Sequence, residues 1–146
     1  MILYVSWGGS GRAASVRAAM SRALAQEESV GRGLRYLAVL DDGSFADLDD
    51  NTLDLVADEL RWLLEAQLEL TKRQLDAADL IVEVLVRRGD VVEAVVDVLG
   101  ERGPAEVLIG APVTPAGSGY ATVDDLRQAL AGRVEARVSV VEPLPT

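Results

Sequence analysis

The sequence predicts an α/β fold in which one parallel sheet carries helices on both faces. Five short apolar runs alternate with segments that show helical periodicity or helix-start signals, and glycine-containing or acidic turns separate them. A strand-helix-strand rhythm of this kind forms right-handed parallel crossover units. The 146 residues are the usual size of one domain, and no long linker or internal repeat divides them. We therefore expect a single domain over residues 1–146.

Two strands and two helices are predicted in the first half of the chain. Residues 2–6 are an apolar run of strand formers, and a glycine turn leads from them into an alanine-rich helix over residues 12–26. Residues 34–40 form the second strand after two glycines end that helix. Over residues 51–77, apolar residues recur at spacings of three and four, which predicts an amphipathic helix about 40 Å long. Its apolar positions are Leu53, Val56, Leu60, Leu63, Leu64 and Leu68.

The second half of the chain contains three further predicted strands, residues 80–86, 106–109 and 136–141. Asp90 and Glu93 are spaced as a capping box at the start of the helix between the first two, and Gly100 with the Gly-Pro pair after it ends that helix. Thr122 and Asp125 form a similar pattern before the last helix. Open α/β sheets bind ligands beyond the carboxyl ends of their strands. The loops at that edge are residues 7–11, 41–50, 88–90 and 110–122.

The charge balance excludes two classes of partner. The formal net charge is −10 at pH 7, from 24 acidic and 14 basic side chains. Such a protein repels nucleic acid backbones and anionic membrane surfaces. No run of about 18 apolar residues is present, and Met1 leads directly into a strand without a basic leader. We expect a cytoplasmic protein that binds neither nucleic acid nor membrane.

The chain contains neither cysteine nor histidine. Disulfides, thiolate nucleophiles, imidazole bases and zinc sites with nitrogen or sulfur ligands are therefore excluded. Any chemistry must depend on carboxylates, hydroxyls, Lys72, arginines or backbone amides. The acidic run Asp41, Asp42, Asp47, Asp49 and Asp50 lacks the order and terminal Glu of a calcium loop, so we predict no metal site. We interpret it as a solvated loop whose acids favour the start of the long helix.

The glycines after the first strand allow more than one interpretation. Residues 9–14 fit the dinucleotide pattern Gly-x-Gly-x-x-Ala, with Asp41 as a possible ribose ligand, but this acid follows about 30 residues later instead of about 20. A plain turn into an alanine-rich helix is the preferred interpretation. Arg12 stands where a phosphate loop needs Lys, and Ser10 has neither the glycine context nor the histidine of a serine hydrolase.

The two tryptophans, Trp7 and Trp62, are interpreted as packing residues, because buried apolar area is the commonest use of an indole ring. Trp7 is the less certain of the two, since it lies at the expected ligand edge.

The order of these segments resembles the universal stress protein family from Ile2 to Val141. The resemblance depends on the first strand with its glycine turn, on Ala38-Val-Leu-Asp41, and on Arg88-Gly-Asp-Val-Val-Glu-Ala followed by Ala105-Glu-Val-Leu-Ile-Gly110. It implies a Rossmann-like open sheet of five parallel strands in the order 3-2-1-4-5. It also implies a homodimer in which the fifth strands pair. Some members of the family bind ATP through an Asp after the first strand and the motif Gly-x2-Gly-x9-Gly-Ser/Thr after the fourth.

This chain departs from the ATP-binding pattern. Trp7 replaces the Asp, Val113 replaces the second glycine, and six residues instead of a longer loop separate Gly110 from Gly117. Two prolines in the loop remove backbone donors, and no Lys or Arg occurs between residues 102 and 127. We expect a non-catalytic regulatory or stress-response protein that binds no ATP and needs no cofactor.

The alternative hypothesis is an adenine-nucleotide binder, possibly with slow hydrolysis, in which Asp41 or Asp90 contacts hydroxyls or magnesium. Its binding loops are residues 8–11 and 110–119. The candidate ligand residues are Trp7, Gly8, Gly9, Ser10, Gly11, Asp41, Gly89, Asp90, Gly110, Gly117, Ser118 and Gly119.

Two further surfaces are predicted to bind protein. The fifth strand alternates Val138 and Val140 with Arg137 and Ser139, and an unpaired strand edge of this kind recruits another strand. We expect the homodimer to form along this edge. A third hypothesis treats the long acidic helix over residues 51–77 as a docking surface for a basic partner.

Overall fold

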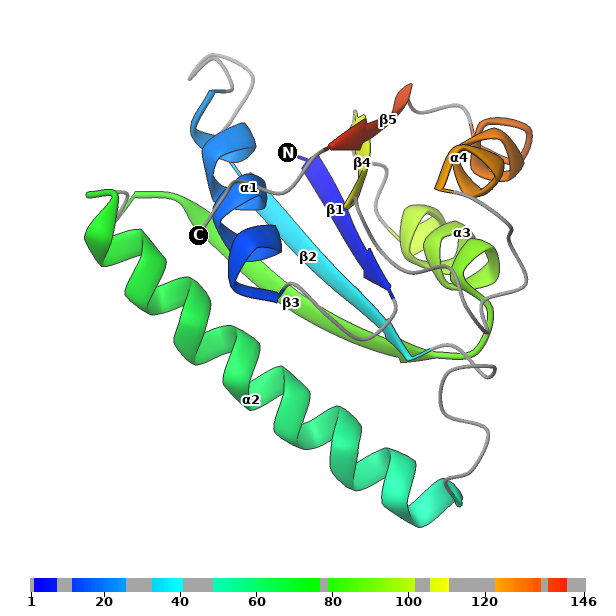
Figure 1. The fold of residues 1–146 in the computed structure, drawn as a ribbon, viewed down its shortest axis with the longest axis horizontal. Helices are drawn as coiled ribbons and strands as arrows, with labels where there is room; N and C mark the ends of the chain where they lie inside the picture. The colour runs from blue at the N-terminus through cyan, green and yellow to red at the C-terminus, as the bar shows by residue number, and fades with distance from the viewer. Residues whose placement is uncertain are drawn as a thin grey trace.

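The computed structural model describes residues 2–7, 12–25, 33–40, 49–76, 79–101, 106–110, 123–134 and 137–141. Strands and helices alternate through these residues as predicted (Figure 1), and their ends differ from the predicted ones by a few residues. They are β1 (Ile2–Trp7), α1 (Arg12–Leu24), β2 (Gly33–Leu40), α2 (Asp50–Gln74), β3 (Ile81–Arg88), α3 (Val91–Glu101), β4 (Glu106–Gly110), α4 (Val123–Ala131) and β5 (Arg137–Val141).

The strands form one parallel sheet in the order β3-β2-β1-β4-β5. β2 pairs with β3 from Gly33 opposite Ile81 to Leu40 opposite Arg88. β1 pairs with both β2 and β4, and β5 pairs with β4. Because every pairing is parallel, the carboxyl ends of all five strands lie at one edge of the sheet. The predicted α/β class and strand order are confirmed.

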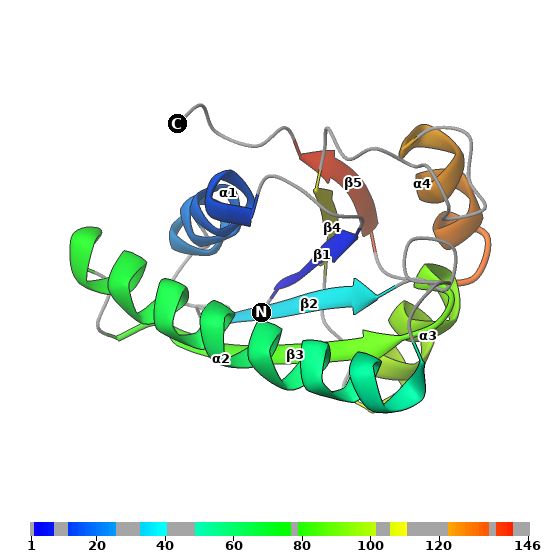
Figure 2. The ribbon, with the colours of Figure 1, turned by 60° about the horizontal axis from the view of Figure 1, so that its bottom comes forward.

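Helices cover both faces of the sheet. Figures 1 and 2 show α1 and α2 on one side and α3 and α4 on the other. Tyr4 and Tyr36 belong to the core beneath α1 and α2, whereas Val5 and Leu37, one residue further along each strand, belong to the core beneath α3 and α4. This alternation follows from the two-residue period of a strand. β2 is buried along its whole length, because it lies inside the sheet and is covered from both sides.

The long helix α2 contributes Leu60, Leu64, Leu68 and Thr71 to the buried interior. Asp49 caps its first turn, because its Oδ1 accepts a hydrogen bond of 2.7 Å from the Thr52 N–H. Hydrogen bonding from Thr52 also holds the pKa of Asp49 below its ordinary value. The interpretation that acids in the preceding run favour the start of this helix is confirmed for Asp49.

Two expectations about the faces of α2 are wrong. Leu63, which was grouped with the apolar positions, is 46% exposed, and Trp62, interpreted as a packing residue, is 67% exposed. At about 100° per residue, Trp62 lies roughly opposite Leu60, Leu64 and Leu68, whereas Leu63 lies at the margin of their face. None of the described helices combines the length and the apolar character needed to cross a membrane.

Candidate functional site

The order of the strands reverses between β1 and β4. From β1 the chain proceeds outward to β2 and β3, and then crosses back to place β4 on the other side of β1. Ligands of open α/β sheets bind at such a reversal, beyond the carboxyl ends of the two strands. Val5 lies opposite Ile109, so the ends of β1 and β4, from which the two predicted ligand loops start, are neighbours in the sheet. The fold therefore brings the beginnings of the two predicted ligand loops together.

The structure describes four of the predicted ligand residues. Trp7 is the last residue of β1 and lies opposite Val39 of β2. Gly89, Asp90 and Gly110 follow or end strands at the same edge. Outside the described residues lie Gly8, Gly9, Ser10, Gly11, Asp41, Gly117, Ser118 and Gly119.

Gly110 has a packing role that the sequence did not reveal. A Cβ atom at this position would lie 2.6 Å from the Tyr4 hydroxyl oxygen and 3.1 Å from two of its ring carbons. Tyr4 is fully buried, and its ring stacks on Tyr36 with centroids 5.5 Å apart and an interplanar angle of 18°. The ring therefore cannot swing aside. Glycine at position 110 is required by the tyrosine beneath it, whether or not a ligand approaches the backbone.

Gly89 links β2 to the start of α3. Its N–H donates a hydrogen bond of 3.0 Å to the carbonyl oxygen of Leu40. Its φ of +107° lies in the region that favours glycine, although an added Cβ would meet nothing within 4 Å. Backbone conformation, not lack of space, therefore explains this glycine.

Asp90 caps α3, as its spacing to Glu93 predicted. Its Oδ2 accepts a hydrogen bond of 3.1 Å from the Glu93 N–H. The Glu93 carboxylate accepts a hydrogen bond of 3.0 Å from Arg133, which follows α4. The carboxylate of Asp90 is thus engaged in holding the helix that starts at this edge.

Arg88 connects the end of β3 to the start of α2. Its two terminal nitrogens lie 2.8 Å from Oδ1 of Asp50 and 3.0 Å from Oδ1 of Asp54. The hydrogen bond to Asp50, together with the attraction of both carboxylates, raises the pKa of Arg88 further above its ordinary value. Sequence reasoning missed this cluster, because its members are 34 and 38 residues apart and no local pattern links them.

Acidic side chains do not gather into a cation site in the described part of the chain. Within it, no three or more Asp or Glu side chains lie close enough together to hold a metal ion. The acids nearest to Arg88 are occupied by its guanidinium group. Asp41, which was considered for magnesium, lies outside the described residues.

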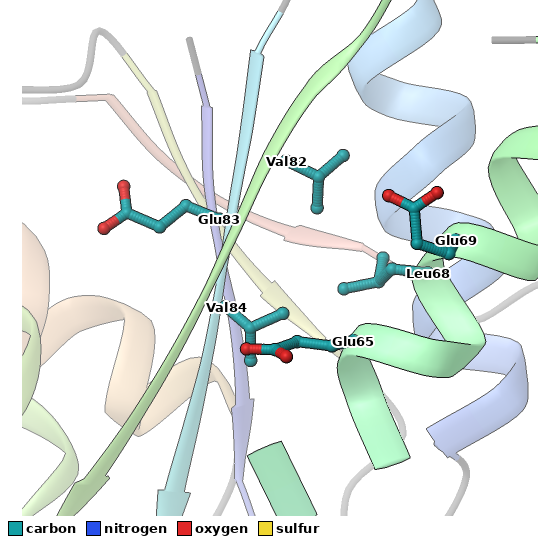
Figure 3. Close-up of a pocket in the computed structure, with 6 residues that line it drawn as sticks. All are labelled: Glu65, Leu68, Glu69, Val82, Glu83 and Val84. Atoms are coloured by element: carbon teal, nitrogen blue, oxygen red, sulfur yellow. The ribbon is translucent and has the colours of Figure 1, made fainter. Parts of the chain in front are cut away.

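A cavity of about 390 Å³ lies between α2 and β3. Figure 3 shows Leu68 of α2 directed toward Val82 and Val84 of β3, whereas Glu83 points to the other side of the strand. Val82 and Val84 lie opposite Leu34 and Tyr36, in the first half of the sheet and not at its carboxyl edge. The remaining lining residues are Glu65 and Glu69.

Several solved structures share this architecture. Hypothetical protein PH0823 has a TM-score of 0.65 at 17% identity, and the match covers 99% of this chain and 95% of that chain. The universal stress protein from Archaeoglobus fulgidus has a TM-score of 0.53 at 19% identity and covers 96% of both chains. UspA from Lactobacillus plantarum has a TM-score of 0.52 at 18% identity, with 96% of this chain and 97% of that chain covered.

The chain has the universal stress protein fold. No family model matches the sequence, and no curated protein matches it either. The likeness is therefore one of backbone architecture at low sequence identity.

The predicted dimer strand forms one edge of this universal stress protein fold. Among the described strands, β5 pairs only with β4, so it is an edge strand of the described sheet. Arg137 is exposed, and Ser139 and Val140 are partly exposed. Val138 packs partly against the core beneath α3 and α4. These residues offer an edge to which a further strand can add.

Proposed function

We propose that the protein is a non-catalytic regulatory protein of the universal stress protein type, which acts in the cytoplasm as a homodimer. The proposal rests on one observation: the described polar side chains at the carboxyl edge of the sheet are engaged in structural contacts. Asp90 caps α3, and Arg88 is bound by Asp50 and Asp54. A carboxylate used as a helix cap, or a guanidinium held by two carboxylates, cannot act on a substrate without giving up that contact.

Electrostatics supports a function that does not depend on ATP. The protein carries a net charge of −10, and residues 111–122 contain no Lys or Arg. Arg88, a cation at the same edge, already faces two carboxylates. A triphosphate would thus approach a field of its own sign with few cations to offset it.

A nucleotide-binding function is the second candidate, and one observation favours it. β1 and β4, from which the two candidate loops start, are neighbours at the reversal of strand order, and sheets of this class bind nucleotides beyond the strand ends at such a reversal. In this alternative, residues 8–11 and 110–119 hold the phosphates together.

Isothermal titration with magnesium-ATP into the millimolar range separates the two candidates, because affinities of about 1 mM still give measurable binding. The non-catalytic, ATP-independent function predicts no saturable heat. The alternative predicts one-to-one binding that Ser118→Glu abolishes, because the new carboxylate occupies the phosphate position, whereas Ser118→Ala retains it. Saturable binding with this dependence would overturn the first proposal.

The homodimer is tested at β5. Val138→Pro removes a backbone donor and fixes φ at a strand position, so we expect it to halve the mass of the assembly in light scattering. Circular dichroism checks that the sheet survives, because Val138 also touches the core. An unchanged mass with an intact sheet would contradict dimerisation through this strand.

A further inference from the structure

β3 is an edge strand of the described sheet, and the backbone groups on its outer side can be identified. The Gly89 N–H donates to the Leu40 carbonyl oxygen of β2, so the backbone groups of Gly89 face β2. The backbone groups of successive strand residues point alternately to the two sides of the strand. Counted back from Gly89 along the register with β2, the N–H and C=O groups of Val82, Val84 and Val86 therefore face away from β2.

This outer edge is closed at one end and open in its middle. Nη1 of Arg87 donates a hydrogen bond of 3.3 Å to the carbonyl oxygen of Val86, which occupies that acceptor. Val82 and Val84 make no hydrogen bond on their outer side to any described residue. Their N–H and C=O groups are therefore available, and an available strand edge is a template for a further strand.

The cavity of about 390 Å³ between α2 and β3 lies at the same two valines. Its apolar surface comes from the buried Leu68 and the half-buried Val82 and Val84. Figure 3 shows β3 in front of the other strands, with both valines directed toward α2. A strand added to this edge would pair its backbone with Val82 and Val84 and place alternate side chains in the cavity. A helix in the same place would leave the backbone groups of β3 unpaired.

Carboxylates around the cavity favour a basic strand. Glu65 and Glu69, one turn apart on α2, line the cavity and are exposed, and Glu83 lies on the other side of β3. Glu69 lies 3.7 Å from Lys72, and Glu83 lies 3.4 Å from Arg35. Glu65 has no ion-pair partner among the described residues. A basic side chain of an added strand would thus find an unpaired carboxylate beside the apolar surface.

The same acids disfavour a second copy of β3 as the added strand. Two such edges paired antiparallel around Glu83 would place the Glu83 carboxylates of both copies opposite each other. Like charges directly opposite destabilise a strand pair. The net charge of −10 adds to this repulsion between copies.

We propose that the outer edge of β3 binds an extended segment of a partner protein by strand addition, and that this segment has an apolar centre flanked by Lys or Arg. The apolar centre enters the cavity over Leu68, and a flanking basic side chain pairs with Glu65. The hypothesis of a basic partner for the long acidic helix is thereby narrowed to one groove. Because β3 and β5 lie at opposite ends of the sheet, a dimer through β5 leaves this edge accessible.

Fluorescence polarisation with a short labelled peptide tests the proposal. The probe is fluorescein-labelled Lys-Lys-Val-Val-Val-Lys-Lys, and its matched control has Glu in place of every Lys. We expect saturable binding of the lysine peptide with a Kd at or below about 1 mM, and no saturation with the glutamate peptide in that range. Failure of the lysine peptide to bind, or equal binding of both peptides, would overturn the proposal.

Methylation of the peptide backbone distinguishes strand addition from simple charge attraction. One version of the lysine peptide is N-methylated at its even-numbered residues and another at its odd-numbered residues. In an added strand only one of these sets faces β3. We expect one version to bind at least about tenfold more weakly and the other to bind like the parent peptide. Equal binding of the two versions would contradict strand addition.

Charge reversal in the protein locates the peptide. Glu65→Lys should weaken binding of the lysine peptide at least about fivefold, because it replaces the attracting carboxylate with a cation. Glu59→Lys is the matched control, since Glu59 is equally an exposed acid of α2 but does not line the cavity. Equal effects of the two substitutions would place the peptide elsewhere and overturn the proposal.

Val84→Pro tests the strand edge itself. Proline removes the outward N–H but no hydrogen bond to β2, and it is tolerated on an edge strand where the N–H faces outward. We expect loss of peptide binding with an unchanged circular dichroism spectrum and, without peptide, an unchanged mass in sedimentation velocity. A lower mass would assign the edge to a second copy of the chain, and retained peptide binding would also contradict the proposal.

Discussion

The close approach of Tyr4 to Gly110 predicts that Gly110→Ala destabilises the protein. The substitution adds one methyl group at the carboxyl end of β4. That group would lie 2.6 Å from the Tyr4 hydroxyl and 3.1 Å from the ring atoms Cε1 and Cζ, all closer than ordinary van der Waals contact. The ring is buried and stacked on Tyr36, so relief requires a shift of the strand or of both rings.

The expected loss follows from this overpacking. Inserting a methyl group into a well-packed core costs about 1–3 kcal/mol of unfolding free energy. For a domain of this size, each kcal/mol lowers Tm by about 2–4 °C, so the variant should melt roughly 2–12 °C below the natural protein. Urea denaturation followed by circular dichroism measures the same loss at constant temperature.

Gly100→Ala is the matched control, because the same methyl group meets nothing within 4 Å near the end of α3. There the substitution should stabilise the protein by about 0.5–1 kcal/mol, since alanine is the better helix former. In a Tyr4→Phe background the nearest contact is absent, so Gly110→Ala should cost at least about 0.5 kcal/mol less than in the natural protein. A Gly110→Ala variant as stable as the natural protein, or equal costs in both backgrounds, would refute the packing role of Gly110.

Three further predictions concern the caps and the ion pairs. Asp90→Ala should lower the unfolding free energy by about 1 kcal/mol through loss of the α3 cap, whereas Asp90→Asn should retain most of the stability that the cap contributes. Urea denaturation measures both variants, and equal losses would contradict the capping role. Arg88→Gln should speed amide hydrogen exchange in the first two turns of α2, because it removes the ion pairs with Asp50 and Asp54. The difference from the natural protein should shrink at high salt, because salt screens these ion pairs. Unchanged exchange would show that the ion pairs do not hold the start of the helix. The pKa of Asp49 lies below its ordinary value of 3.8, so its stabilising contribution is present above that pH and is lost as the pH falls through the lowered value. Urea midpoints between about pH 5 and pH 2.5 should therefore fall more steeply for the natural protein than for Asp49→Asn, which keeps an acceptor but does not titrate; parallel curves would contradict this.

The amino-acid sequence by itself determined the features that depend on local pattern. Alternating apolar runs and helical segments fix the α/β class, because strand and helix periods are properties of neighbouring residues. The spacing of Asp90 and Glu93 likewise predicted a cap, which needs only three residues of chain. The strand order followed from the resemblance to universal stress proteins and is confirmed.

Tertiary structure alone decided which residues meet across long stretches of sequence. The sequence identified Gly110 as a loop glycine, but only the pairing of β1 with β4 brings Tyr4 beneath it. Arg88 finds Asp50 and Asp54 because the end of β3 and the start of α2 converge in space. The leucines of α2 recur at spacings of three and four, which is compatible with more than one apolar face. Packing against α1 and β3 buries the face formed by Leu60, Leu64 and Leu68. Trp62 and Leu63 are exposed for that reason: periodicity defines the faces of a helix, but only its neighbours determine which face is buried.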